Sequence, residues 1–87
     1  MSAEGGETQT KVRQFITSNF YVPDPSALAD EASLLDQGII DSTGVLELIG
    51  FLEDSFGVKV EDAEMVPENL DSVARIVAFV GRKKGTL

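Results

Sequence analysis

The strongest constraint on the fold is a run of apolar residues at helical spacing behind an Asp-Ser pair at residues 41–42. The stripe, at i, i+4, i+7 and i+11, consists of Val45, Ile49, Leu52 and Phe56. Residues at this spacing share one face of an α-helix. Asp41 is a favourable N-cap residue, and Gly57 is typical of a helix end. The sequence therefore predicts an amphipathic helix that begins after Asp41 and ends at Gly57.

Two other segments also have apolar residues at helical spacing. The first spans roughly residues 8–20, carries Val12, Phe15, Ile16 and Phe20, and ends before Pro23 and Pro25. The last begins after Pro67, with Asn69 or Asp71 as its cap, and carries Leu70, Val73, Ile76, Val77 and Val80. Between the second and the last helix we expect one short helix at 62–66, closed by Pro67.

Residues 21–40 show no sustained period, although 26–35 could include a helical turn. Apolar residues in this long loop can hold it across the helices; they are Leu28, Leu34, Leu35, Ile39 and Ile40. We therefore predict an all-α fold, a four-helix bundle of three longer helices and one short one with a long first loop. Residues 8–84 form its single domain, between a flexible N-terminal tail at 1–7 and a C-terminal tail at 85–87.

Composition limits the possible functions. The 87 residues include no cysteine and no histidine, so nucleophile and base pairs built on these residues are excluded. A Ser-Lys pair is formally possible, but four of the seven basic residues lie in the last thirteen positions. We therefore expect neither an enzyme nor a metal site, and no loop fits the calcium-binding pattern of an EF-hand.

The net charge of −8 would repel nucleic acids and anionic lipids, and favours a basic partner unless it only maintains solubility. The first eleven residues lack the order of a signal peptide, and no apolar run is long enough to span a membrane. Together with the absence of cysteine, these features predict a cytoplasmic protein without membrane insertion. We expect it to be a monomer.

Ser42 lies on the first turn of the second predicted helix, beside its apolar stripe. Asp-Ser pairs often serve only as helix caps. However, free backbone N–H groups and the positive end of the helix dipole also favour a bound or attached anion at this position. The residues alone leave both roles open.

The surrounding sequence resembles the acyl carrier protein family. LLDQGIIDSTGVLELIGFLEDSFGVKV is similar to the family's stretch from the long loop through helix II, and VPENLDSVARIVAFV is similar to its helix IV. The resemblance covers about residues 9 to 83. It implies that Ser42 receives phosphopantetheine from coenzyme A and that Asp41 docks with the phosphopantetheinyl transferase.

The resemblance also implies a swinging arm that carries an acyl thioester between enzymes with basic docking patches. The residues implied in partner binding are Thr43, Leu46, Glu47, Gly50, Phe51, Glu53 and Asp54. Family members can shelter an acyl chain between their helices, and the candidate lining residues are Leu46, Ile49, Phe56, Met65 and Ile76. The alternative is that these five are ordinary core residues.

Three positions depart from the family pattern. Thr43 replaces the common leucine, Gly44 replaces the acidic residue usual in fatty-acid carriers, and Gly50 replaces a position that is often larger and apolar. We therefore expect a specialised carrier with its own partner enzymes. Two alternatives stay open: a carrier of peptidyl or aminoacyl groups, and an unmodified acidic helical adaptor that binds a basic partner.

Overall fold

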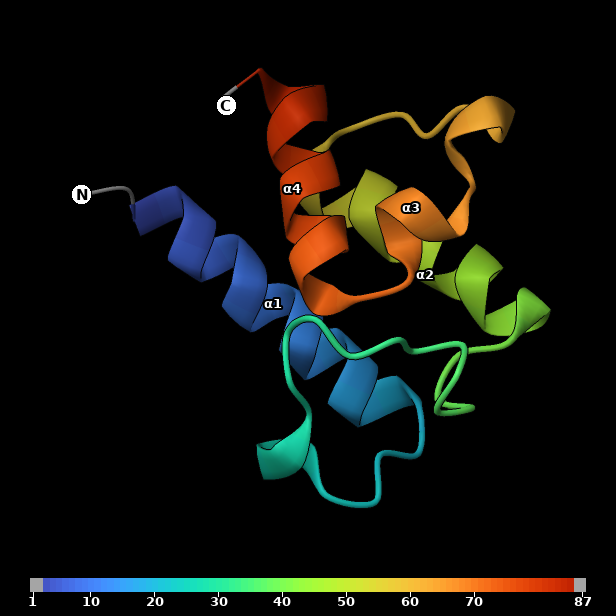
Figure 1. The fold of residues 1–87 in the computed structure, drawn as a ribbon. Coiled ribbons are helices and arrows are strands. Elements are labelled where there is room, and N and C mark those ends of the chain that lie inside the picture. Colours follow the sequence, from blue (N-terminus) through green and yellow to red (C-terminus); the bar gives the residue numbers. More distant parts are fainter. Residues whose placement is uncertain (1–2, 86–87) are drawn as a thin grey trace.

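The structure is a computed structural model that describes residues 3–85. Over these residues the chain is helical, which confirms the predicted fold class. The elements are α1 Ala3–Asn19, the 3₁₀ turn η1 Pro25–Ala27, α2 Ser42–Phe56, the 3₁₀ turn η2 Asp62–Glu64, α3 Pro67–Leu70 and α4 Val73–Lys84. Figure 1 shows α4 between α1 and the short α3, with the long loop between α1 and α2 crossing the ends of the helices.

The core face of α2 is rotated slightly from the predicted stripe. Leu48, Ile49 and Leu52 are buried, and so is Gly44, whereas Val45 and Phe56 at the two ends of the stripe are only partly buried. Residues 44, 48 and 52 stand four apart, so they lie along one side of the helix. The buried apolar residues elsewhere in the described chain are Val12, Ile16, Leu28, Leu34, Ile39, Ile40, Val60, Leu70, Val73, Ile76, Phe79 and Val80.

The first helix begins at Ala3, earlier than the predicted start near residue 8. That residues 1–7 form a flexible tail stays a prediction. Local contacts extend the helix toward its N-terminus, since the Thr10 hydroxyl donates to the Gly6 carbonyl at 2.9 Å and Lys11 pairs with Glu7 at 3.4 Å. Gly85 caps α4 with a positive φ of 73°. The remaining tail residues, 1, 2, 86 and 87, lie outside the described residues.

The C-terminal half corrects two predictions. The 3₁₀ turn η2 ends at Glu64, and Pro67 opens α3 instead of closing a helix. Proline suits the first helical position, because its φ is fixed there and its missing N–H would have had no partner. Ser72, not Asn69 or Asp71, caps α4: its hydroxyl accepts from the Arg75 N–H at 3.1 Å.

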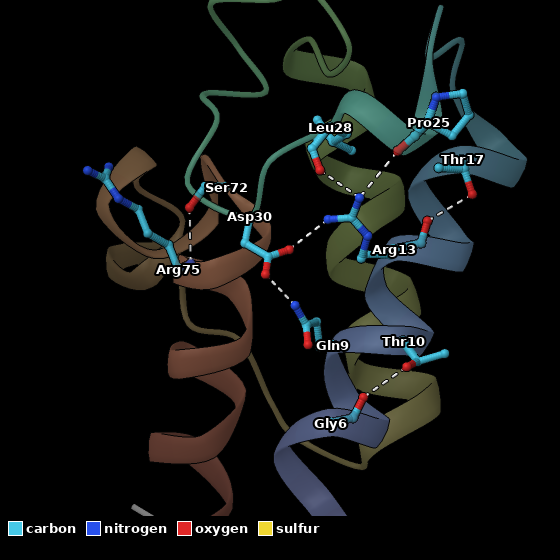
Figure 2. A network of polar contacts seen from close by, with 10 residues as sticks. All are labelled: Gly6, Gln9, Thr10, Arg13, Thr17, Pro25, Leu28, Asp30, Ser72 and Arg75. Carbon is cyan, nitrogen blue, oxygen red and sulfur yellow. Dashed lines mark hydrogen bonds and ion pairs between the residues drawn. The ribbon is translucent and has the colours of Figure 1, made fainter.

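The first half of the long loop is held by a polar network around Arg13 (Figure 2). The Arg13 guanidinium pairs with the Asp30 carboxylate at 2.6 Å and donates to the Leu28 and Pro25 carbonyls at 2.6 and 3.3 Å. The Gln9 side chain also donates to Asp30. The Asp30 carbonyl accepts from the Ala74 N–H of α4 at 2.8 Å. These bonds tie residues 25–30 to both α1 and α4.

The second half of the loop is held by Asp71, which lies between α3 and α4. The Asp71 carboxylate accepts from the Ser33 hydroxyl at 2.6 Å and from the Leu35 N–H at 2.9 Å. Its backbone carbonyl accepts from the Leu34 N–H at 2.7 Å. Because Leu34 is fully buried as well, residues 33–35 are fixed against the C-terminal helices.

Candidate functional site

Ser42 is the first residue of α2, and its side chain is exposed. Asp41 is the N-cap: its Oδ1 accepts from the Gly44 N–H at 2.8 Å, and its backbone carbonyl accepts from the Val45 N–H at 2.9 Å. One carboxylate oxygen of Asp41 therefore fixes the turn that carries Ser42. The hydroxyl lies at the positive end of the helix dipole, where a negatively charged substituent is favoured.

A cavity of about 280 Å³ opens beside Ser42. Three segments enclose it: the second half of the long loop, the first turn of α2, and the chain from Met65 to Asp71. Its polar lining residues are Ser42 and Asp71, and its apolar ones are Leu34, Leu35, Ile40, Val45, Met65, Val66, Pro67 and Leu70. The exposed serine thus stands at the edge of a largely apolar space.

Of the five residues predicted to line an acyl pocket, Met65 lies in this lining. Ile49 and Ile76 are buried in the core, and Phe56 is partly buried against Phe51. Leu46 is 63% exposed. The cavity forms farther toward the loop than we expected, and the α3 residues Pro67 and Leu70 contribute to its lining. The sequence feature that could have indicated this cavity is the apolar character of loop residues 34, 35 and 40 in an otherwise irregular segment.

The predicted partner face divides in two. Thr43, Leu46, Glu47, Gly50 and Asp54 are exposed on α2. By contrast, the Phe51 ring stacks on Phe15 of α1 at 4.3 Å. Glu53 is exposed but also accepts from the Val60 N–H at 3.0 Å, so it holds the segment that follows α2.

Gly44 does not lie on that face. It is buried, and a Cβ built on it would lie 2.8 Å from Cε1 of Phe20. By its resemblance to the family, Gly44 stands at a position where fatty-acid carriers usually have an acidic residue. In this chain the Phe20 ring occupies the space beside the Gly44 Cα.

An ion pair supports the far wall of the cavity. Lys83 of α4 contacts Glu64 of η2 at 2.8 Å, and Glu64 directly precedes Met65. The hydrogen bond from Lys83, followed by one from the Glu61 N–H, lowers the pKa of Glu64 from its ordinary value. The pair therefore favours the ionised carboxylate and ties η2 to α4.

Residues 3–85 contain neither a membrane-spanning helix nor a metal-binding cluster. No helix there is long and apolar enough to cross a membrane. Within the same range, no group of acidic side chains is arranged to hold a metal ion.

The arrangement at Ser42 fits the phosphopantetheine group that the sequence predicts. The hydroxyl is accessible to another protein, the helix start favours the negative charge of a phosphodiester, and the neighbouring cavity can receive apolar atoms. The residues that would hold the group are Ser42 by a covalent bond and the cavity lining by contact.

Comparisons with known proteins agree with this fit. The family model described as phosphopantetheine attachment site matches residues 10–80. An acyl carrier protein of Thermotoga maritima is 35% identical over 79 residues, which cover 91% of this chain and 94% of that protein. A D-alanyl carrier protein of Streptococcus pyogenes serotype M1 is 39% identical over 60 residues, which cover 69% of this chain and 75% of that protein.

Proposed function

This chain belongs to the acyl carrier protein family, whose members bear covalent phosphopantetheine, and from that premise we propose that Ser42 is the residue that carries the group here. The observation that supports this assignment most directly is the exposed hydroxyl of Ser42, on the first turn of α2 and at the edge of the apolar cavity. When bound, the group supplies a thiol on a flexible arm that holds an acyl group as a thioester.

The attachment step needs a second protein, because this chain has no histidine or cysteine to activate a hydroxyl. The Ser42 oxygen attacks the phosphorus of coenzyme A that bears the pantetheine arm. The bond from this phosphorus to the oxygen bridging to the adenosine part breaks, and 3′,5′-adenosine bisphosphate leaves. A base of the transferase takes the hydroxyl proton. Asp41 contributes by holding the first turn of α2 in place and by offering its carboxylate for docking.

The carrier family is not itself catalytic, and we propose that this chain likewise passes its cargo between enzymes in the cytoplasm as a monomer. The surface available to these enzymes is the exposed side of α2, with Leu46 as an apolar contact and Glu47 and Asp54 as carboxylates. A protein with a net charge of −8 attracts basic docking patches, and salt should slow their association.

We propose an apolar acyl group as the cargo, and a specialised pathway as its setting. Eight of the ten lining residues are apolar, which favours an alkyl chain over a charged group. The likeness to D-alanyl carrier proteins supports a second candidate, an aminoacyl cargo. In that case the Asp71 carboxylate is the lining group able to attract an ammonium.

The test of Ser42 is the intact mass of the protein after incubation with coenzyme A, magnesium and a promiscuous phosphopantetheinyl transferase. We expect the wild-type chain to gain one phosphopantetheine and Ser42→Ala to gain none. Ser55→Ala is a matched control, because Ser55 also follows an aspartate and is exposed on the same helix, at its other end. Loading of Ser42→Ala would contradict the assignment.

The cargo is tested on the loaded protein. If an alkyl chain enters the cavity, attaching it should raise the melting temperature, because the bound chain stabilises only the folded state. We expect a medium-length saturated acyl chain to raise it more than an alanyl group does. An equal or larger rise with alanyl would favour the aminoacyl carrier.

A further inference from the structure

Phe20, the residue directly after α1, packs on the first turn of α2. A Cβ at Gly44 would meet Cε1 of Phe20 at 2.8 Å and Cγ2 of Ile40 at 3.3 Å. The first distance is shorter than real Cβ contacts, so a side chain at position 44 would have to displace the ring. The absence of a side chain at Gly44 therefore allows α1 and α2 to meet at this point.

The Phe20 ring is partly buried and has an aromatic neighbour. It contacts Phe15 edge to face, with ring centroids 5.8 Å apart and planes at 76°. Phe15 is itself stacked on Phe51 of α2. The ring on Gly44 is thus the end of an aromatic series that joins the two helices, and such pairs add to the free energy gained by burial alone.

This contact lies on the turn that carries Ser42. The N–H of Gly44 donates to the Asp41 cap, while the Cα side of Gly44 meets Phe20. Ser42 stands between Asp41 and Gly44 in the chain, so the cap and the ring both contact the turn that carries its hydroxyl.

Gly50, the second glycine of α2, lies near the middle of the helix and provides a contrast. A Cβ at Gly50 would meet nothing within 4 Å, whereas Gly44 is closed. There is therefore no room for a side chain at Gly44, on the turn that carries Ser42, although there is room at Gly50.

We propose that Phe20 and Gly44 form a positioning pair that fixes the first turn of α2 and so presents Ser42 to the phosphopantetheinyl transferase. This inference rests on the proposed function of Ser42. It also gives a physical reason for the glycine at position 44: the Phe20 ring occupies the space that a Cβ there would need.

The test is a double-mutant cycle with Gly44→Ala, Phe20→Leu and the combined variant. The measured quantity is kcat/KM for loading by the transferase, followed by intact mass well below the melting temperature. A displacement of about 1 Å can cost up to ~100-fold in rate, so we expect Gly44→Ala to lower kcat/KM roughly tenfold. Phe20→Leu alone should lower it by a smaller factor.

The combined variant distinguishes positioning from stability. Leucine removes the ring atom nearest position 44, so the alanine methyl can be accommodated, and loading should recover to within about threefold of wild type. The melting temperature should stay below wild type, because leucine does not restore the aromatic contact with Phe15. Gly6→Ala is the control. Gly6 lies in α1, far from Ser42 in sequence, and a Cβ added to it would meet no atom within 4 Å.

Additive losses in the cycle would overturn the inference, as would wild-type loading by Gly44→Ala. A loading loss that merely follows the unfolded fraction, measured by circular dichroism, would also overturn it. If Gly44→Ala does not fold, the comparison of Phe20→Leu with the combined variant decides, and a combined variant that loads about tenfold more slowly than Phe20→Leu counts against the pair. No loading of the wild-type chain would instead refute the proposed function.

Discussion

The two halves of the long loop are fastened by groups of opposite charge. In the first half, the cation of Arg13 reaches out of α1 to the Asp30 carboxylate and to two loop carbonyls (Figure 2). In the second half, the carboxylate of Asp71 accepts from a hydroxyl and an N–H of the loop. Each half also buries a leucine, Leu28 in the first and Leu34 in the second.

The two anchors differ in what they border. None of the residues that Arg13 contacts lines the cavity beside Ser42, whereas Asp71 and its partner Leu35 both do. The first anchor therefore fixes the path of the chain, and the second also shapes the site. Mutations at the two anchors should consequently separate stability from cargo binding.

Removing the first anchor should have the largest effect on stability. Arg13 and Asp30 are 28% and 33% exposed, so the pair is partly desolvated. Arg13→Ala also removes the donor to the Leu28 carbonyl, while the Pro25 carbonyl keeps the bond from the Leu28 N–H. We expect a loss of about 2 kcal/mol in the free energy of unfolding. A change of this size should lower the melting temperature by roughly 10 °C in a domain of this length.

Lys11→Ala is the control for this prediction, because Lys11 lies in the same helix and its ion pair with Glu7 is exposed. Its cost should be at most about 0.5 kcal/mol in a urea titration. Transferase loading of folded Arg13→Ala should stay at the wild-type rate. Equal stability of the two variants would show that the first anchor is not stronger than an ordinary surface pair.

The helices of the bundle could be predicted from the sequence, because the spacing of apolar residues within each helix depends only on that segment. The cap at Asp41 and the end at Gly57 were also readable, since capping depends on residue type and neighbours only. The order of elements after Pro67 was less accessible: proline there was consistent with ending one helix or with starting another, and Ser72 competed with Asp71 as a cap.

The site could be predicted only in part. Ser42 and the exposed side of α2 follow from position on a helix, but the cavity depends on how distant segments meet. The Asp71 contacts bring loop residues 33–35 to the α3–α4 junction. No local sequence pattern predicts a contact between segments so far apart in the chain. The burial of Gly44 under Phe20 was inaccessible for the same reason.

Removing the second anchor should cost less stability and change the cavity more. Asp71→Ala loses two hydrogen bonds but keeps the bond from the Leu34 N–H to the backbone carbonyl, so we expect a loss of about 1.5 kcal/mol. With Leu35 less restrained, the rise in melting temperature caused by acylation should shrink to about half. Calorimetry of loaded and acylated protein measures both effects.

Asp36→Ala provides the comparison for Asp71→Ala, because Asp36 is an exposed carboxylate in the same part of the loop. It should leave the acyl-dependent rise at its wild-type size. If Arg13→Ala diminished that rise as much as Asp71→Ala does, the two halves of the loop would act as one unit and the distinction between them would fail.

The smallest effect concerns the wall opposite the loop, where Lys83 holds Glu64 next to Met65. Because the pKa of Glu64 is lowered in the folded state, its contribution to stability is present above the pKa of the unfolded chain. The contribution is lost as the pH falls through the folded-state value. Wild type should therefore be slightly more stable than Glu64→Gln at neutral pH, and the difference should vanish in acid.

Urea titrations of both proteins across acidic to neutral pH measure this difference. Repeating them in a Lys83→Gln background provides the internal control, because removing the ammonium removes the largest cause of the lowered pKa. The pH dependence of the difference should become weaker there, and an unchanged dependence would assign the effect to another group. Since Asp71 lines the cavity and neither Glu64 nor Lys83 does, loss of this pair should alter the acyl-dependent rise in melting temperature less than Asp71→Ala does.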